Sequence, residues 1–208
     1  MAENYQILLD KELARITKEQ RKPRLLLHAC CAPCSSYVLE YLSRYFEITV
    51  LFYNPNISPA SEFELRAEEL SRLIGSMLLE NPVNCLVGRY DPAEFFAIAQ
   101  GHEQDPEGGE RCTACFRLRL EESARMAKKG GYDYFTTTLS ISPLKDAKRL
   151  NQIGGELAEQ YGVPYLFSDF KKREGYKRSI QLSAEYSLYR QDYCGCAYSK
   201  RDAENRKK

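Results

Sequence analysis

The sequence predicts an α/β protein: a Rossmann-like parallel sheet of five strands with helices on both faces, followed by a helical C-terminal segment. Short apolar, β-branched runs alternate with longer segments of helical periodicity, which is typical of βαβ units. The expected strands are apolar almost throughout, as in strands buried on both faces. The length of 208 residues suits one such domain.

Each element follows from a local pattern. The five expected strands are 24–29, 46–53, 83–87, 132–139 and 165–170. Apolar residues at helical spacing predict helices over 1–20, from about 35 to 45, from 59 to about 80, and over 91–101, 112–129, 145–161 and 179–189. Gly130-Gly131 closes one of these helices as an expected C-terminal cap, and another helix is expected to stop at Gly162.

These elements predict a simple organisation. We expect an N-terminal helical extension (1–22), a single α/β catalytic domain (23–199) and a charged tail (200–208). No stretch approaches the ~20 apolar residues that span a bilayer. Charged residues such as Asp10 and Lys11 occupy the place of a signal peptide's apolar run. We therefore expect a cytoplasmic protein with no membrane partner.

Charge is unevenly distributed along the chain. The net charge is +1, yet residues 171–208 carry eleven Lys/Arg against five Asp/Glu. This segment also contains the tyrosines on which bases could stack, namely Tyr176, Tyr186, Tyr189, Tyr193 and Tyr198. A basic, tyrosine-rich end favours an anionic partner, with nucleic acid first. The alternative is a solvated tail, with Tyr186 and Tyr189 packed on the sheet.

Eight cysteines are the strongest chemical signal. In a reducing compartment they favour metal binding or redox catalysis over structural disulfides. Seven are clustered, as Cys30, Cys31 and Cys34, as Cys112 and Cys115, and as Cys194 and Cys196. Cys85 stands alone, and we expect it to be a small buried hydrophobe.

The first two clusters have metal-ligand character. Cys30 and Cys31 follow the first strand, at the sheet edge where such folds bind ligands. Cys112 and Cys115 share one helical face near a helix N-terminus, which we expect to favour thiolates. Vicinal cysteines suit an iron–sulfur cluster better than one tetrahedral zinc. The two clusters offer up to five thiolates, and a [4Fe–4S] cluster takes four, which leaves one for a second metal or for substrate. The alternative to an iron–sulfur cluster is one structural zinc.

Other residues narrow the chemistry. A disulfide across Cys194-Gly195-Cys196 would close a small, strained ring, and strained disulfides are labile and usually catalytic. The alternative is two more metal ligands. The chain has no Gly-rich phosphate-binding loop, and its two histidines disfavour a His-based zinc hydrolase. His28 could orient a ligand or be a satisfied core residue.

An ordered series of motifs resembles the QueH-type epoxyqueuosine reductases. The motifs are His28-Ala29-Cys30-Cys31-Ala32-Pro33-Cys34, Phe52-Tyr53-Asn54-Pro55-Asn56-Ile57, Arg111-Cys112-Thr113-Ala114-Cys115, Thr136-Thr137-Thr138-Leu139, Ser142-Pro143 and Tyr189-Arg190-Gln191-Asp192-Tyr193-Cys194-Gly195-Cys196. The resemblance runs from about Arg24 to Ser199. The vicinal cysteines together with the Cys-Gly-Cys element make it specific.

The resemblance implies a fold, a reaction and a set of site residues. The family has a nucleotide α-hydrolase-like fold and reduces epoxyqueuosine to queuosine at the tRNA wobble position, the last step of queuosine biosynthesis. Cys30, Cys31, Cys112 and Cys115 would then ligate a [4Fe–4S] cluster, and Cys194 and Cys196 would form a redox-active disulfide. Cys34 stands where some relatives carry Asp beside a second, mononuclear iron. The expected partners are tRNA and an electron donor.

Two alternatives have different chemistry. One is a zinc-stabilised tRNA-binding protein without a redox role, and the other is an ATP-independent tRNA-modifying sulfur transferase. Thiolation normally needs ATP activation, so the missing phosphate-binding loop argues against the second alternative. Metal content separates the reductase from the zinc protein.

Overall fold

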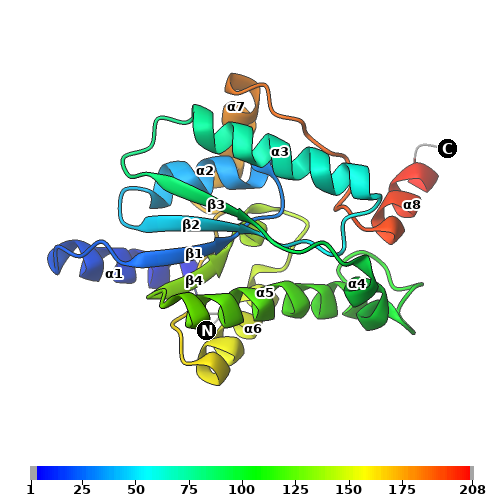
Figure 1. Cartoon of the computed structure of the whole chain (residues 1–208), viewed down its shortest axis with the longest axis horizontal. Coiled ribbons are helices and arrows are strands. Elements are labelled where there is room, and N and C mark those ends of the chain that lie inside the picture. Colours follow the sequence, from blue (N-terminus) through cyan, green and yellow to red (C-terminus); the bar gives the residue numbers. More distant parts are fainter. Residues whose placement is uncertain (1–3, 207–208) are drawn as a thin grey trace.

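A parallel sheet with helices on both faces forms the centre of the protein (Figure 1). The computed structural model describes residues 4–206. Within them the sheet has four strands in the order β3-β2-β1-β4. The strands are β1 (Arg24–His28), β2 (Glu47–Phe52), β3 (Val83–Val87) and β4 (Tyr134–Thr137). All neighbouring strands pair in parallel, which confirms the predicted fold class.

The helices form two layers around this sheet. They are α1 (Tyr5–Lys18), α2 (Ala32–Leu42), α3 (Ala60–Ser76), α4 (Pro92–Ala99), α5 (Glu110–Gly130), α6 (Ala147–Tyr161), α7 (Gly175–Glu185) and α8 (Ala197–Arg206), with a 3₁₀ turn η1 (Thr138–Ile141). Helices α2 and α3 cover one face, where α7 packs on α2, and α5 and α6 cover the other (Figure 1). No helix within residues 4–206 is long and apolar enough to cross a membrane. Residues 1–3 of the predicted first helix and 207–208 of the predicted tail lie outside the described residues.

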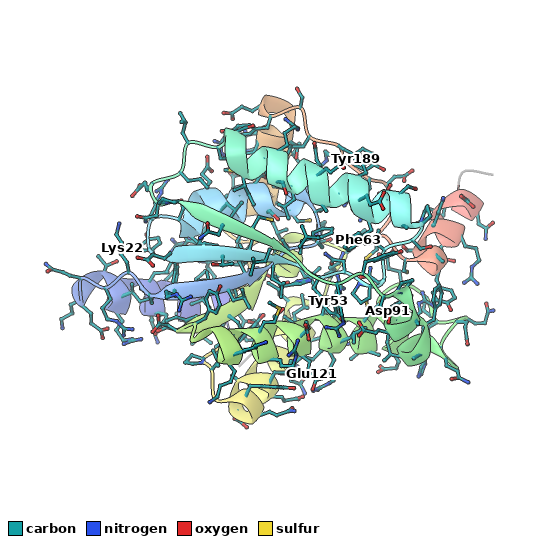
Figure 2. The ribbon with its side chains drawn as sticks, in the orientation of Figure 1. Lys22, Tyr53, Phe63, Asp91, Glu121 and Tyr189 are labelled. Atoms are coloured by element: carbon teal, nitrogen blue, oxygen red, sulfur yellow. The ribbon has the colours of Figure 1, made fainter. Side chains whose placement is uncertain are left out.

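Successive residues of β1 face opposite layers. Leu25 and Leu27 belong to the core cluster with α1, α2 and α3, whereas Leu26 belongs to the cluster with α5 and α6. Beyond the strands the same division holds, with Phe63 on the first side and Tyr53 on the second (Figure 2). This alternation explains why three successive positions of β1 are leucine, since both faces of the strand are buried.

The predicted fifth strand over 165–170 is wrong. The segment forms a single bridge, between Tyr165 and Phe135 of β4. Pro164 has no N–H to extend the ladder before it. Further along, the side chain of Asn151 accepts from the backbone N–H of Ser168 at 2.9 Å and donates to its carbonyl at 2.8 Å. A helix side chain therefore satisfies the backbone groups that a strand partner would have used.

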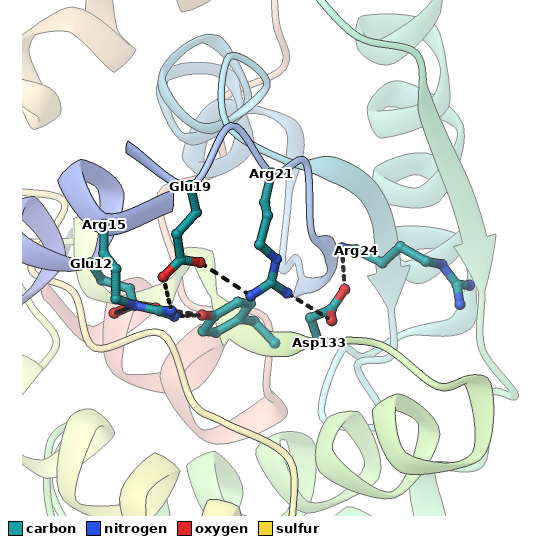
Figure 3. Close-up of polar contacts among 7 residues, drawn as sticks. Glu12, Arg15, Glu19, Arg21, Arg24 and Asp133 are labelled. Atoms are coloured by element: carbon teal, nitrogen blue, oxygen red, sulfur yellow. Dashed lines mark hydrogen bonds and ion pairs between the residues drawn. The ribbon is translucent and has the colours of Figure 1, made fainter. Parts of the chain in front are cut away.

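Hydrogen bonds and ion pairs connect α1 and the residues after it to the amino edge of the sheet (Figure 3). Arg15 contacts Glu12 at 2.6 Å and Glu19 at 2.8 Å, and it also donates to the Tyr134 hydroxyl. A second set joins Arg21 to Asp133, whose carboxylate accepts from the Arg24 backbone N–H at 2.8 Å. The other face of α1 buries Leu9, Leu13 and Ile16 in the core.

Candidate metal and substrate site

Three thiols converge at the carboxyl end of β1. The Sγ atoms of Cys30, Cys31 and Cys34 lie within 4.8 Å of one another, and those of Cys30 and Cys31 are 3.7 Å apart. Cys31 is the N-cap residue of α2, and Cys34 lies in its first turn, so both thiols share one helical face. Asn54 fixes the preceding loop by donating to the Ala29 carbonyl at 2.8 Å. A buried donor set of this kind can hold a metal ion.

The three thiols do not titrate alike. Hydrogen bonds from Cys30 and Cys34 hold the pKa of Cys31 well below its usual range. Hydrogen bonds with Cys30 and Cys31 raise the pKa of Cys34, and the bond to Cys31 raises the pKa of Cys30. The cluster therefore stabilises one thiolate, at Cys31, with two thiols that donate to it. Thiolate is the form that binds metal.

Four further cysteines surround a second, smaller cavity of about 20 Å³. Its lining includes Cys112, Cys115, Cys194 and Cys196. Burial raises the pKa of Cys112, although the Gly108 N–H donates to its sulfur at 3.3 Å, and burial raises the pKa of Cys115 to about 12. The expectation that the start of α5 would favour thiolates here is wrong, because desolvation outweighs the helix terminus.

The Cys194-Gly195-Cys196 element is held by backbone contacts. Both cysteines are free thiols in this structure, as are the chain's other six. Arg66 donates to the Cys194 carbonyl at 3.1 Å. Gly195 has a φ of +128°, and a Cβ at this position would lie 3.0 Å from Ile57 and 3.1 Å from Arg66. Glycine thus permits both the backbone conformation and the close approach of Arg66.

The main cavity, of about 340 Å³, opens beside the three-thiol cluster. Cys30, Cys34 and Cys194 line it together with Arg119. Its other charged and aromatic lining residues are Glu107, Lys145, Tyr176, Arg190, Asp192, Tyr193 and Arg206. Arg119, Glu107 and Cys194 also line the smaller cavity, so the two cavities adjoin. Thiols, cations and aromatic rings therefore meet at the carboxyl edge, where parallel sheets bind ligands.

Three buried arginines lie near the thiols; the sequence analysis named Arg111 only as part of a motif and did not single out the other two. Arg66, Arg111 and Arg119 are each about 1% exposed. Arg119 follows Cys112 by seven positions and Cys115 by four, which puts it on the cysteine face of α5. That spacing could have predicted from the sequence that Arg119 lies beside the cysteines. The burial of Arg66 depends on contacts with a segment 128 residues away, which no local pattern predicts.

Lys145 is a further cation that the sequence analysis missed. It precedes α6 and lines the main cavity. No hydrogen bond or ion pair of its ammonium group occurs within residues 4–206. Burial acts to lower the pKa of Lys145, but the electrostatic effect of the nearby cysteine sulfurs, Cys194 first, outweighs it and the pKa is raised. The cavity therefore holds a protonated amine beside the cysteines.

Other residues singled out by sequence have structural roles. His28 is fully buried, with Thr137 Oγ1 at 2.9 Å and the Tyr53 carbonyl at 3.1 Å from its ring nitrogens. Burial lowers its pKa to about 4, so it is a neutral core residue. Cys85 is partly buried on β3 and packs against the core. Tyr186 packs against the same core, whereas Tyr189 is 38% exposed.

The chain is similar to several curated proteins that share one name. The chain is 42% identical to an epoxyqueuosine reductase QueH of Staphylococcus epidermidis, over 94% of this chain and 84% of that protein. It is 41% identical to the protein of that name from Streptococcus pyogenes, over 94% and 78% of the two chains. The Thermotoga maritima protein of that name is 35% identical, over 84% and 89%.

A solved structure and a family profile complete the comparison. The structure is titled a predicted subunit of tRNA methyltransferase from Methanocaldococcus jannaschii, with a TM-score of 0.49 and 15% identity over 77% of this chain and 74% of that one. The profile described as "Epoxyqueuosine reductase QueH" matches residues 25–202, which include all the site cysteines. The chain therefore belongs to the QueH family of epoxyqueuosine reductases.

Proposed function

We propose that this protein reduces epoxyqueuosine to queuosine at the wobble position of tRNA. The reaction breaks the two C–O bonds of the epoxide and leaves a carbon–carbon double bond. It consumes two electrons and two protons, and the oxygen leaves as water. An external one-electron donor must supply the electrons. Family membership over residues 25–202 supports this assignment.

The observation that carries the proposal is the main cavity with thiols along its inner wall. A volume of about 340 Å³ is in the range of small-molecule sites and can take a single everted nucleoside. Tyr176 and Tyr193 offer rings for a base, and Arg190 and Arg206 offer charge for the flanking phosphates. The reacting ring of the nucleoside would then lie near Cys30, Cys34 and Cys194.

The donor set fits a thiolate-ligated cluster. The residues proposed to hold a [4Fe–4S] cluster are Cys30, Cys31, Cys112 and Cys115, of which Cys30 lines the main cavity and Cys112 and Cys115 line the smaller one. One guanidinium nitrogen of Arg119, Nη2, is buried without a hydrogen-bond partner, as expected for a donor to a bound group. When bound, such a cluster supplies electrons one at a time. Cys34 is proposed to hold a second metal ion.

The chain's own groups handle protons and charge. Breaking a C–O bond puts negative charge on oxygen, which a nearby cation stabilises. Lys145 lines the main cavity, and its Nζ can donate both a hydrogen bond and a proton to that oxygen. Cys194 and Cys196 are proposed as a redox-active pair. Their conversion from two thiols to a disulfide releases two electrons and two protons, which matches the demand of the reaction.

Turnover of a defined tRNA tests the proposal. Anaerobically purified protein would be mixed with tRNA that carries epoxyqueuosine and with a chemical one-electron reductant. Digestion and mass spectrometry of the nucleosides should show a product that is lighter by one oxygen atom. Metal-loaded protein that leaves the nucleoside unchanged would contradict the proposal. With Cys194 and Cys196 both changed to Ser, unchanged turnover under the same reductant would remove this pair from the electron path.

One observation favours a second candidate, a tRNA-binding protein with structural zinc. Two thiolates on a tetrahedral zinc, each at about 2.3 Å from the metal, are about 3.8 Å apart. The Cys30 and Cys31 sulfurs are separated by 3.7 Å. A zinc-loaded protein would bind the same tRNA with the same affinity whether or not a reductant is present. It would also be colourless, whereas an iron–sulfur protein is brown.

A further inference from the structure

Arg119 is a buried cation with no carboxylate partner. It is about 1% exposed, and none of the ion pairs among residues 4–206 includes it. Its Nε donates to the Cys115 carbonyl at 3.1 Å, and its Nη1 lies 3.5 Å from the Asn54 amide oxygen. Its Nη2 is buried without any hydrogen-bond partner. Two guanidinium nitrogens, Nε and Nη1, therefore have protein acceptors, and the third, Nη2, can still donate a hydrogen bond to a bound group.

The other two buried arginines also each have one nitrogen without a hydrogen-bond partner, Nη2 of Arg66 and Nε of Arg111, but their charge is compensated by protein groups. Arg66 forms an ion pair with Glu62 at 2.7 Å. Arg111 Nη1 donates to three backbone carbonyls of the loop that precedes α5, at 2.6 to 3.2 Å. A buried charge without such compensation is costly. Arg119 thus requires an anion that protein carboxylates do not provide.

The side chains that line the same cavities as Arg119 include four cysteines, namely Cys30, Cys112, Cys115 and Cys194. These cysteines belong to both cavities, and Arg119 lines both. Asn54 connects the two sides, because it contacts Arg119 and also donates to the Ala29 carbonyl next to Cys30. Arg119 therefore adjoins both groups of cysteines.

We propose that Arg119 is the counter-cation of the metal–sulfur group held by these cysteines, with its Nη2 donating a hydrogen bond to a sulfur of that group. It is a positioning residue that makes the group easier to reduce. This inference rests on the proposed function. A positive charge and an N–H···S hydrogen bond both stabilise the state that carries the additional electron. The effect is large where water is excluded, as it is around Arg119.

A redox titration of loaded protein tests this role directly. The variants are Arg119→Met, which keeps most of the volume and removes the charge, and Arg119→Lys, which keeps the charge and removes the forked donor. Arg117→Met is the matched control, because Arg117 lies on the same helix but is exposed and paired with Glu156. Absorbance and electron paramagnetic resonance would follow reduction, and thermal melts would check folding.

The reduction potential should be highest in wild type, lower in Arg119→Lys and lowest in Arg119→Met. At a fixed ambient potential, the ratio of reduced to oxidised protein should fall at least tenfold in Arg119→Met, which is 59 mV for a one-electron couple. Arg117→Met should titrate like wild type. If Arg119→Met does not fold, Arg119→Lys still has to show a lower potential than wild type.

The outcomes separate this role from the proposed function. A loaded and active Arg119→Met protein with the wild-type potential would overturn the role of Arg119 and leave the reductase intact. Wild-type protein that binds zinc and no sulfide would overturn both. A lower potential in both Arg119 variants, with the control unchanged, would support the assignment.

Discussion

The two edges of the sheet differ in whether their cationic side chains have carboxylate partners. At the amino edge, Arg15 and Arg21 are partly exposed, and each has carboxylate partners, Glu12 and Glu19 for Arg15 and Glu19 and Asp133 for Arg21 (Figure 3). At the carboxyl edge, Arg119 is buried and has no carboxylate partner within residues 4–206. Lys145 lines the cavity there without an ion pair in the described part of the chain.

This difference distinguishes charges that are paired within the fold from buried charges that we expect a bound ligand to pair. Exposed pairs contribute little each, and they are complete without any other molecule. A buried cation beside thiols is incomplete until an anionic group is bound. Sites that break the usual pairing rules are where function is expected. The predictions below test this contrast from the largest expected effect to the smallest.

The largest effect is expected from the three-thiol cluster. Cys30→Ser or Cys31→Ser removes a buried thiolate donor and should lower kcat/KM by more than about 100-fold, beyond the 10–100-fold typical of an outer-shell partner. Bound iron should fall in parallel. Cys85→Ser is the matched control, since Cys85 lies on β3 outside both cavities. Wild-type activity in Cys30→Ser would contradict the site.

Asn54 supports the thiols and should give the next largest effect. Asn54→Leu removes the hydrogen bond to the Ala29 carbonyl and the contact to Arg119. We expect a loss of about 10–100-fold in metal retention or activity. Retention can be measured as iron left after dialysis against a chelator. Asn84→Leu, at an exposed position on β3, should retain iron like wild type. Equal retention in both variants would show that Asn54 does not support the site.

A smaller effect is expected at the mouth of the main cavity. Arg190 lines the cavity and is exposed, so Arg190→Ala should raise KM for tRNA several-fold and leave kcat nearly unchanged. Loss of one phosphate contact should also reduce the slope of log KM against log salt by about 1. Arg21→Ala, at the opposite edge, should change neither. The same KM shift in both variants would mean that the tRNA does not dock at the carboxyl edge.

The smallest effect is expected at the amino edge. Hydrogen bonding to Arg15 holds the pKa of Glu12 below its ordinary value near 4.5. A carboxyl with a lowered native pKa stabilises the fold above its unfolded-state pKa, and this stabilisation is lost as pH falls through the native value. Glu12→Gln should therefore lower the free energy of unfolding by about 0.2–1 kcal/mol at pH 7. Urea unfolding should show this difference vanish in acid, with activity at pH 7 unchanged; a difference that persists in acid would contradict the assignment.

The fold was predictable where hydrophobic pattern decides it. The apolar run of β1 predicts a strand buried on both faces, and both core clusters use it. The segment after Pro164 has the composition of a strand too, but the buried side chain of Asn151 takes its backbone hydrogen bonds. Whether Asn151 or a strand partner takes these hydrogen bonds depends on how α6 packs, which a local sequence pattern does not predict.

The candidate site was partly predictable for a similar reason. Cys30 and Cys31 follow β1 directly, so the rule for parallel sheets places them at the ligand-binding edge. The titration of Cys112 was predicted in the wrong direction, because burial in the assembled site outweighs the helix terminus. Arg66 and Lys145 were missed because an exposed and a buried cation look alike in sequence. Their roles arise only when distant segments meet.

The central claim is that the carboxyl edge holds an iron–sulfur centre. The most direct test is anaerobic purification of the whole chain, followed by iron, zinc and sulfide analysis and an absorption spectrum. The account predicts about four irons and four sulfides per chain, with a broad visible band that bleaches on reduction. Stoichiometric zinc without sulfide, found again after attempted cluster reconstitution, would contradict it.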